Sequence, residues 1–340
     1  MYKLKIILPY ILIFIGYYLF STFSQFKYDD FIHSKYFQVL IDMILVIGLY
    51  GAVYGINTNA FKENFKLIFS VITIGVIFKV IFVGTILFLL TDNPLSFLLA
   101  TIIAQIDPVS VASLDNTKSK LTKQGKTILR AWASFDDPIT VVLAISISMI
   151  ILSIQTSPLS IFYTELYNLL LVFLIYIIYY FIKNKSSILL YVLLFFAFIF
   201  SIYFELFLAI AVIGLFLRPK LPFLDLLIYL LFLIVSFVIG VFINNGINLY
   251  EGVLYGVFTI LAQVITTFIL GRELIRCDKV RLSIAQQSGI TAITLSLFLA
   301  TKHDDIIPTI IVAIITINIL YVIINFLTEK YFIKDKYKNQ

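Results

Sequence analysis

The chain has 340 residues, of which 61% are hydrophobic and only 13% are charged, and it carries a formal net charge of +6. A typical soluble domain is about half apolar and about a quarter charged, so this composition predicts a protein whose main solvent is lipid. One cysteine excludes an internal disulfide and a cysteine-based metal site. Two histidines, His33 and His303, are too few and too far apart for a histidine ligand cluster.

About twelve stretches are candidates to cross a bilayer, which takes roughly 20 mostly apolar residues. In chain order they lie at about 4–23, 37–56, 67–90, 95–114, 128–153, 161–182, 187–203, 205–217, 223–243, 249–270, 281–300 and 306–327. The eighth is short, which leaves the helix count around 187–217 open. The predicted fold class is an all-α polytopic membrane protein with about 12 transmembrane helices.

The distribution of basic residues supports this number of spans. If the N-terminus is cytoplasmic, nearly all of the 25 basic residues fall in alternate loops or at the two ends, and the opposite loops hold only Lys27, Lys35 and Lys302. This is the pattern of the positive-inside rule. It predicts cytoplasmic termini and explains the positive charge without a nucleic-acid partner. Usage rich in isoleucine, lysine and phenylalanine is typical of an AT-rich microbial genome, so we expect the cell (plasma) membrane of a microbe.

Two of the spans contain similar short sequences, which indicates an internal repeat. "IAQIDPVSVASL" at 103–114 and "IAQQSGITAITL" at 284–295 belong to the fourth and eleventh spans, which must cross the bilayer in opposite directions. Each is interrupted, by Asp107-Pro108 in one copy and by Ser288-Gly289 in the other. Paired Gly/Pro-interrupted segments indicate a transporter site, and broken helices are tolerated at membrane depth where they are buried in protein or line a cavity. We therefore expect inverted-topology repeats with two broken crossing helices.

The stretch "AWASFDDPIT" at 131–140 sets two adjacent acids against an apolar run. An aspartate at the centre of a transmembrane helix costs about 2.5–3.5 kcal/mol on insertion scales, so Asp137 is a candidate functional residue. The alternative is that Asp136 or Asp137 caps a helix that begins at Pro138. Arg130 and Trp132 favour the membrane interface and place it before the acids, which supports burial.

Asp107 has the same two interpretations, a cap at a proline kink or an oxygen ligand beside freed backbone groups. Oxygen ligands suit hard cations. One acid can hold either a proton or a metal ion, and competition between the two is the chemical basis of antiport. Lys79 and Gln263 are single polar residues on apolar spans, for which snorkelling or a structural role is expected. With the spacing between the two copies, the position equivalent to Asp137 is Asn318, a lone amide in the last span.

Motifs of other protein classes do not occur in the sequence. It has no phosphate-binding glycine loop, Walker lysine, nucleophile elbow or metal-hydrolase helix. This argues against an ATP-driven pump and against an enzyme, and we expect no cofactor beyond the transported ions.

At these residues the chain resembles the cation/proton antiporter superfamily, in particular the sodium/proton exchangers. "QIDPVSV" resembles the Thr-Asp-Pro-Val segment of that family's unwound core helix, and "SFDDPITVV" resembles its paired-acid segment. "SGITAITLSLFLA" is similar to the Gly-rich interrupted helix of the second repeat. The resemblance implies that Asp137 binds the cation and the proton, that Asp136 is its neighbour in the pair, and that Asp107 is the acid of the unwound crossing.

The resemblance also implies a domain organisation and a homodimer. Panel helices that form the dimer would be residues 1–66 and 155–248, the core ion-transport repeats would be 67–154 and 249–327, and 328–340 would be a cytoplasmic tail. The chain departs from the family at two places. Ile106 replaces a threonine, and Gln263 is the best positional match to a lysine or arginine that pairs with a site acid. Without that cation, the two acids must share a proton, meet another partner, or sit in a wetter site.

The sequence thus predicts a secondary antiporter that exchanges Na⁺, or else Li⁺ or K⁺, for H⁺ by alternating access. Asp137 would be the shared carrier and, with Asp107, would hold the cation, while Asp136 tunes the site. Supporting roles are expected for Gln263, Ser288, Thr291 and Asn318. The alternatives are a sodium-coupled solute symporter of inverted-repeat design and a membrane receptor or scaffold whose acids are helix caps.

Overall fold

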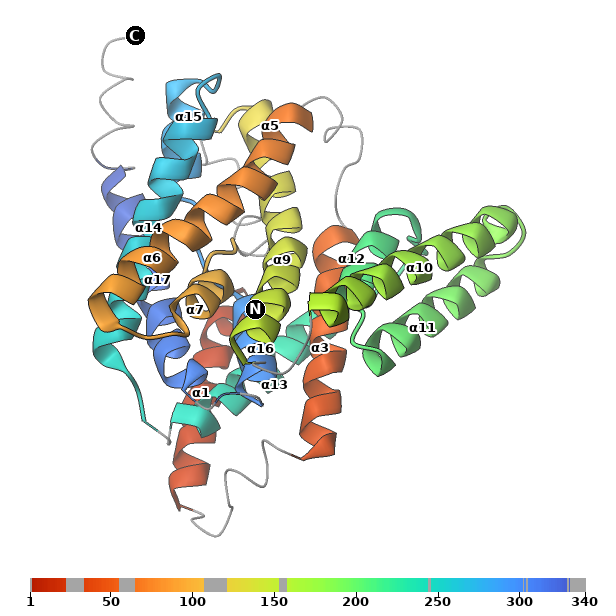
Figure 1. The fold of residues 1–340 in the computed structure, drawn as a ribbon, viewed down its shortest axis with the longest axis horizontal. Coiled ribbons are helices and arrows are strands. Elements are labelled where there is room, and N and C mark those ends of the chain that lie inside the picture. Colours follow the sequence, from red (N-terminus) through yellow and green to blue (C-terminus); the bar gives the residue numbers. More distant parts are fainter. Residues whose placement is uncertain are drawn as a thin grey trace. The chain divides into compact units, whose positions relative to one another are not determined.

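The computed structural model shows a helical protein (Figure 1). It describes residues 2–22, 34–54, 65–106, 121–152, 158–243, 246–301, 303, 305–328 and 330, and no β-strand occurs among them. Contacts between segments divide the chain into two compact units. The division of the chain into panel and core segments that the sequence suggested stays a prediction.

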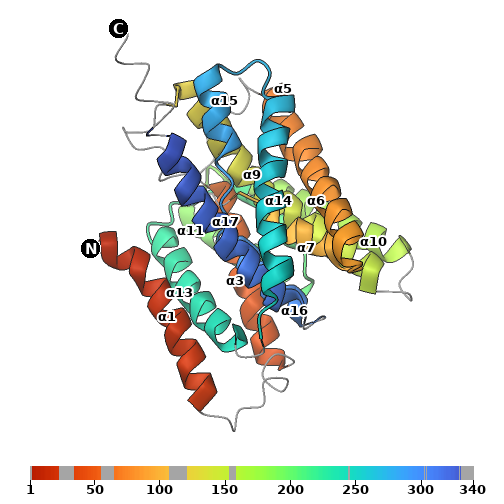
Figure 2. The same cartoon turned by 90° about the vertical axis from the view of Figure 1, so that its left-hand side faces the viewer.

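The first unit consists of Met1–Ile56, Asp137–Ile247 and Ile290–Pro308. Its helices are α1 (Tyr2–Thr22), α3 (Lys35–Tyr54), the second part of α9 (Lys123–Leu152), α10 (Pro158–Ile182), α11 (Ser187–Tyr203), α12 (Phe207–Phe216), α13 (Leu224–Ile243) and α16 (Ile290–Ala300). Helix α3 packs against α11, α12, α13 and α16, and α1 lies along α13 (Figure 2). At Gly240 of α13 a Cβ atom would strike the carbonyl oxygen of Ile13, so this close approach requires glycine.

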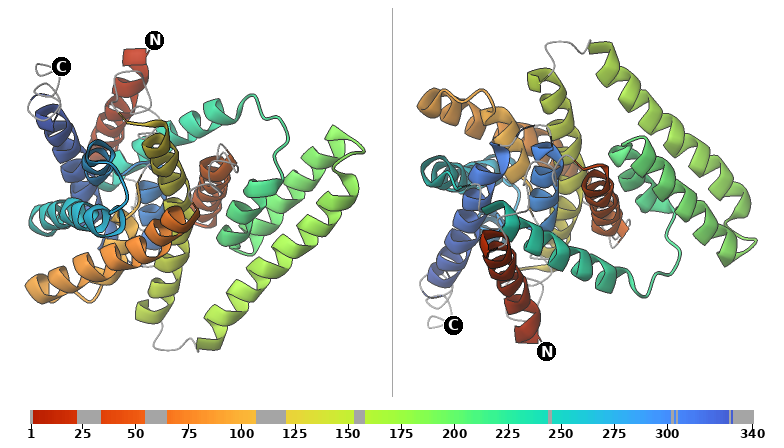
Figure 3. Two further views of the ribbon diagram at one scale, coloured as in Figure 1. Left: turned by 90° about the horizontal axis from the view of Figure 1, so that it is seen from above. Right: turned by 90° about the horizontal axis from the view of Figure 1, so that it is seen from below.

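Helices α10 and α11 of the first unit lie side by side (Figure 3). Many of their apolar side chains are exposed. Only 11% of the most apolar window of Phe162–Ile182 is buried inside the protein. An apolar surface of this extent is unusual on a protein in water, whereas in a bilayer it faces lipid. The exposed side chains of α10 therefore agree with a membrane-spanning chain.

The second unit consists of Asn57–Asp136, Asn248–Gly289 and Thr309–Gln340. Its elements are α5 (Phe65–Ser70), the π-helix η1 (Val71–Gly75), α6 (Val76–Thr91), α7 (Ser96–Ile103), the first part of α9, α14 (Leu249–Leu270), α15 (Arg276–Ser283) and α17 (Ile306–Thr328) from Thr309 onward. Helix α14 packs against α6, α7 and α15. Its Gly256 faces α17, where a Cβ atom would lie 2.7 Å from Cβ of Thr316.

The helices correspond to the predicted spans. Among the described residues, six helices are long and apolar enough to cross a membrane: Lys35–Tyr54, Lys66–Thr91, Phe162–Ile182, Leu224–Ile243, Leu249–Leu270 and Ile306–Thr328. The predicted spans at 187–203 and 205–217 are the shorter apolar helices α11 and α12. The predicted all-α polytopic fold class is confirmed.

Of the two predicted breaks, the second lies wholly within the described residues. Helix α15 ends at Ser283 and α16 begins only at Ile290, so the eleventh span is interrupted around Ser288-Gly289 as predicted. In the fourth span α7 ends at Ile103, and the next three residues are not helical. Asp107 and Pro108 themselves lie outside the described residues.

Candidate functional site

The two adjacent acids lie in the middle of a helix. Helix α9 begins at Lys123 and continues through Pro138 to Leu152. Asp136 and Asp137 are 0% and 1% exposed. The alternative in which these acids cap a helix that starts at Pro138 is therefore wrong, and the interpretation as buried carboxylates is correct.

The start of α9 is set by Asp278 of α15. The backbone N–H of Thr122 donates to Oδ1 of Asp278 at 3.0 Å, and the Thr122 hydroxyl donates to the other carboxylate oxygen. Gly125 donates its N–H to that hydroxyl at 3.0 Å, and a Cβ on Gly125 would lie 2.5 Å from the carboxylate carbon. These bonds satisfy N–H groups that a helix start leaves without partners. The helix therefore begins about four turns before the acids.

Asp136 forms a buried ion pair with Lys79 of α6. The Nζ atom of Lys79 lies 3.1 Å from Oδ2 of Asp136, and both side chains are 0% exposed. Lys79 also donates to the carbonyl oxygen of Ala104 and lies 5.8 Å from the ring centre of Trp132. Lys79 therefore does not snorkel, and Trp132, which the sequence placed at the interface, is buried. The partner that the sequence left open for the acid pair is Lys79, in the span preceding the first break.

The same oxygen of Asp136 contacts the non-helical residues after α7. The backbone N–H of Ile106 donates to Oδ2 of Asp136 at 3.0 Å. Because Lys79 holds Ala104 and Asp136 holds Ile106, the segment that leads into Asp107 is fixed by a cation and an anion together. Burying either charge without the other would be strongly unfavourable.

Asp137 contacts the helix that follows the second break. The hydroxyl of Thr291, in the first turn of α16, donates to Oδ2 of Asp137 at 2.7 Å. Asp137 and Thr291 are 1% and 6% exposed, and both belong to the first unit. A carboxylate and a hydroxyl provide the oxygen ligands that hard cations prefer. The carboxylate can also take up a proton, so the pair can serve either ion.

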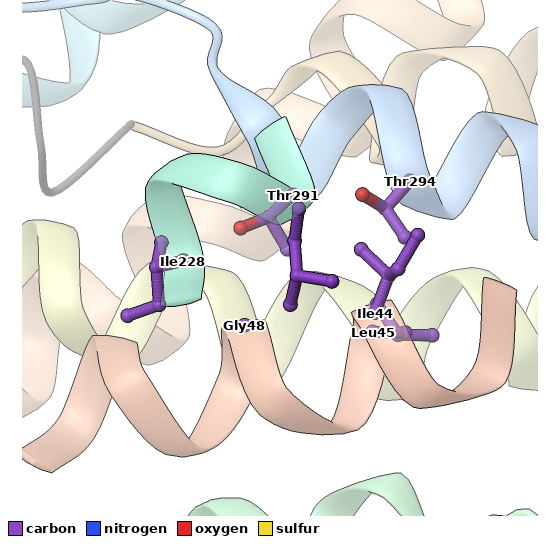
Figure 4. Close-up of a pocket in the computed structure, with 7 residues that line it drawn as sticks. Ile44, Leu45, Gly48, Ile228, Thr291 and Thr294 are labelled. Carbon is purple, nitrogen blue, oxygen red and sulfur yellow. The ribbon is translucent and has the colours of Figure 1, made fainter. Parts of the chain in front are cut away.

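A small pocket reaches this threonine. Figure 4 shows Thr291 and Thr294 on α16 beside α3. The lining residues are Ile44, Leu45, Gly48, Ile228, Leu231, Thr291 and Thr294. The walls are apolar except for the two hydroxyl groups, so an ion in this pocket meets its polar contacts on α16.

The remaining predicted site residues lie in the second unit and do not all come together. Asn318 of α17 donates to the carbonyl oxygen of Ser288 at 3.2 Å, which joins the last helix to the second break. Gln263 of α14 is buried and donates to the carbonyl oxygen of Leu282 at 3.1 Å and to the hydroxyl of Thr267 at 3.4 Å. Gln263 thus holds the end of α15.

Two residues that the structure brings into the site were outside the predicted set. Lys79 was noted only as a lone cation, although a cation on an apolar span and an acid on another are a signal for a buried ion pair. Gln286 donates through Nε2 to the carbonyl oxygens of Ile103 at 3.2 Å and of Gln105 at 2.8 Å. Its signal was the repeated "IAQ", which marked the residue without indicating a role.

Comparison with known proteins gives a match in structure but none in sequence. No protein-family model and no curated protein matches the chain. Among solved structures, the chain resembles the sodium proton antiporter MjNhaP1 from Methanocaldococcus jannaschii at pH 8. The TM-score is 0.75 at 18% identity, over 93% of this chain and 91% of that one.

An electron-microscopy map structure of the same antiporter gives a TM-score of 0.67 at 19% identity, over 94% of this chain and 89% of that one. Identities this low establish the fold and leave the activity to be argued from the residues. The chain is therefore a polytopic helical membrane protein with the fold of this sodium proton antiporter.

Proposed function

We propose that the protein is a secondary active antiporter that exchanges Na⁺ for H⁺ across its membrane by alternating access. The observation that carries this proposal is the buried carboxylate of Asp137, which accepts a hydrogen bond from Thr291 beside a pocket. The antiporter fold supports it over most of the chain. The proposal makes the protein a transporter rather than an enzyme, with Na⁺ and H⁺ as its cargo and no cofactor.

Asp137 is the carrier because the two acids differ in their surroundings. Asp136 is paired with the ammonium group of Lys79, which compensates its charge within the protein. The contact of Asp137 with Thr291 is to a neutral hydroxyl. When Asp137 loses its proton, a monovalent cation can take the proton's place at the carboxylate, with the oxygen of Thr291 as a further ligand. Competition between the two ions at one carboxylate couples their movements.

The other predicted site residues take secondary roles in this proposal. Asp136 and Lys79 hold the segment after α7 in place. The role that the family resemblance implies for Asp107, a second acid that holds the cation, stays a prediction. Asn318 supports the second break by donating a hydrogen bond to the backbone carbonyl oxygen of Ser288. Gln263 supports the end of α15.

The proposal includes the arrangement implied by the family resemblance. Residues 67–154 and 249–327 would form the core repeats, and 1–66 and 155–248 would form panel helices through which two copies make a homodimer. Both termini and the tail at 328–340 would be cytoplasmic, in the cell membrane of a microbe.

The test is ion exchange in proteoliposomes that contain a pH-sensitive dye and an imposed pH gradient. Wild-type protein should dissipate the gradient after a pulse of Na⁺, and Asp137→Asn, which cannot take up a proton at that side chain, should not. Asp225→Asn is the matched control, because it replaces an aspartate with an asparagine at an exposed position in the first turn of α13. Pulses of Li⁺ and K⁺ in the same vesicles define the cation.

Three other outcomes would each contradict the proposal. Equal dissipation by wild type and Asp137→Asn would exclude Asp137 as the carrier. Uptake of Na⁺ that requires an organic solute and moves no protons would indicate a symporter. An absence of ion flux from well-folded wild-type protein would favour a receptor or scaffold.

A further inference from the structure

One peptide group in the second unit, between Gln105 and Ile106, is held at both of its polar atoms. Its carbonyl oxygen, that of Gln105, accepts a hydrogen bond from Nε2 of Gln286 at 2.8 Å. Its N–H, that of Ile106, donates to Oδ2 of Asp136 at 3.0 Å. Because a peptide group is planar and its N–H and C=O point in opposite directions, fixing the direction of the oxygen also fixes the direction of the N–H.

Gln286 belongs to a set of side chains that satisfy the end of α7. A helix end leaves its last carbonyl groups without partners in the helix, and at membrane depth water does not replace them. Here Gln286 donates to the carbonyl oxygens of Ile103 and Gln105, and Lys79 donates to that of Ala104. Three consecutive carbonyl groups are thus held by two side chains from distant parts of the sequence.

We propose that Gln286 is a positioning residue for the ion site, which keeps the Gln105–Ile106 peptide turned so that its N–H points at Asp136. Its link to transport rests on the proposed antiport function. Without the amide of Gln286, the peptide can rotate about its flanking bonds, Asp136 loses a hydrogen-bond donor, and the residues that lead into Asp107 lose their fixed direction.

The chemistry of the position explains why a glutamine serves it. The side-chain amide has two N–H bonds on one nitrogen, which is what two neighbouring carbonyl groups require. An ionised glutamate would repel both oxygens, and a lysine would add a second buried cation beside the Lys79–Asp136 pair. Gln286 is 1% exposed, so water cannot take over its role.

The repeated sequence shows that position alone does not decide this role. Gln105 occupies the place in the first copy of "IAQ" that Gln286 occupies in the second. The side chain of Gln105 donates to the carbonyl oxygen of Ile102, three residues back in α7, at 2.9 Å. Gln286 instead donates to the other copy, so it joins the two breaks within the second unit.

The experiment compares Gln286→Leu with Gln287→Leu. Gln287 is the neighbouring, half-buried glutamine. Its replacement by leucine is the same chemical change but leaves the hydrogen bonds of Gln286 in place. The first measurement, hydrogen–deuterium exchange of residues 104–106 in lipid nanodiscs, does not depend on transport. Loss of a hydrogen bond is worth roughly 1 kcal/mol, so exchange should be about fivefold faster in Gln286→Leu and unchanged in Gln287→Leu. The second measurement is Na⁺-driven exchange, where the KM for Na⁺ should rise by about the same factor while the maximal rate changes less.

Unchanged deuterium exchange in Gln286→Leu, or an equal increase in Gln287→Leu, would overturn the positioning role whatever the transport result. Faster deuterium exchange with an unchanged KM would overturn its link to the ion site and leave the proposed antiport intact. Wild-type protein without exchange activity would overturn the antiport proposal, and with it that link, even if deuterium exchange rises. If Gln286→Leu does not fold, Gln286→Asn, whose amide is one methylene short of the two carbonyl groups, is measured in the same way.

Discussion

The ends of α7 and α15, which lead into the two copies of the repeated sequence, share a backbone turn. After α7 the N–H of Ala104 donates to the carbonyl oxygen of Thr101 at 3.3 Å. After α15 the N–H of Ala285 donates to that of Leu282, also at 3.3 Å. These residues occupy equivalent places in the two copies of the repeated sequence. The repeated sequence therefore corresponds to a shared local conformation of the backbone.

The two ends differ in the charge of one side chain that holds them, and the end of α7 is held by the neutral amide of Gln286 as well. The end of α7 is held by the ammonium group of Lys79, and the end of α15 by the neutral amide of Gln263. The carbonyl end of a helix favours a positive charge, but a buried cation also needs an anion. Asp136 supplies that anion beside α7. The buried cation therefore lies where Asp136 needs a counter-charge, and a neutral donor is sufficient at the end of α15.

Replacement of Lys79 should have the largest effect on the stability of the protein. Lys79→Leu leaves Asp136 buried without its counter-charge, so the free energy of unfolding should fall by about 3–5 kcal/mol. Thermal unfolding in detergent, followed by the loss of helical circular dichroism, measures it. The double variant Lys79→Leu/Asp136→Leu should recover much of the loss. If the single variant Lys79→Leu unfolded at the same temperature as wild type, this result would contradict a stabilising ion pair.

The corresponding change at the other end should have a smaller effect. Gln263→Leu removes one hydrogen bond to the carbonyl oxygen of Leu282, which keeps the N–H of Ala285 as a donor. The expected loss is about 1 kcal/mol of unfolding free energy, measured by the same melting experiment. If Gln263→Leu were as destabilising as Lys79→Leu, the distinction between a charged and a neutral end would be wrong.

The smallest expected effect tests whether α15 also organises α9. Asp278→Asn keeps an acceptor for the N–H of Thr122 but loses the negative charge at the helix start. The expected cost is about 0.5–1 kcal/mol, and Asp225→Asn at the exposed start of α13 is the control. Equal melting of both variants would show that the buried cap adds nothing beyond an ordinary helix start.

Much of the fold could be predicted from the sequence because lipid imposes strong constraints on it. Apolar runs of sufficient length gave the helices, and Ser288-Gly289 marked the break that the structure shows between α15 and α16. The burial of Asp137 was one of two interpretations. The stretch "SFDDPIT" has the local features of a helix start, whereas the observed start depends on Thr122 and Asp278, which are 156 positions apart.

The partner of the acid pair could not be predicted because it depends on packing between helices. The resemblance directed attention to Gln263, the position where relatives carry a cation. The cation lies instead in the span before the first break, and Lys79 is 57 positions from Asp136. The five-residue π-helix η1 comes shortly before Lys79 and alters the helical register there. No fixed spacing in the repeat pairs Lys79 with Asp136.

The most direct test of the central claim is proton release on addition of Na⁺ to purified protein in weakly buffered detergent solution. If a proton and Na⁺ compete for the carboxylate of Asp137, wild type should release protons in an amount that saturates with Na⁺. Asp137→Asn should release none, and Asp225→Asn should behave as wild type. Equal, saturating release from wild type and Asp137→Asn would contradict the account, because the competition would then take place at another group.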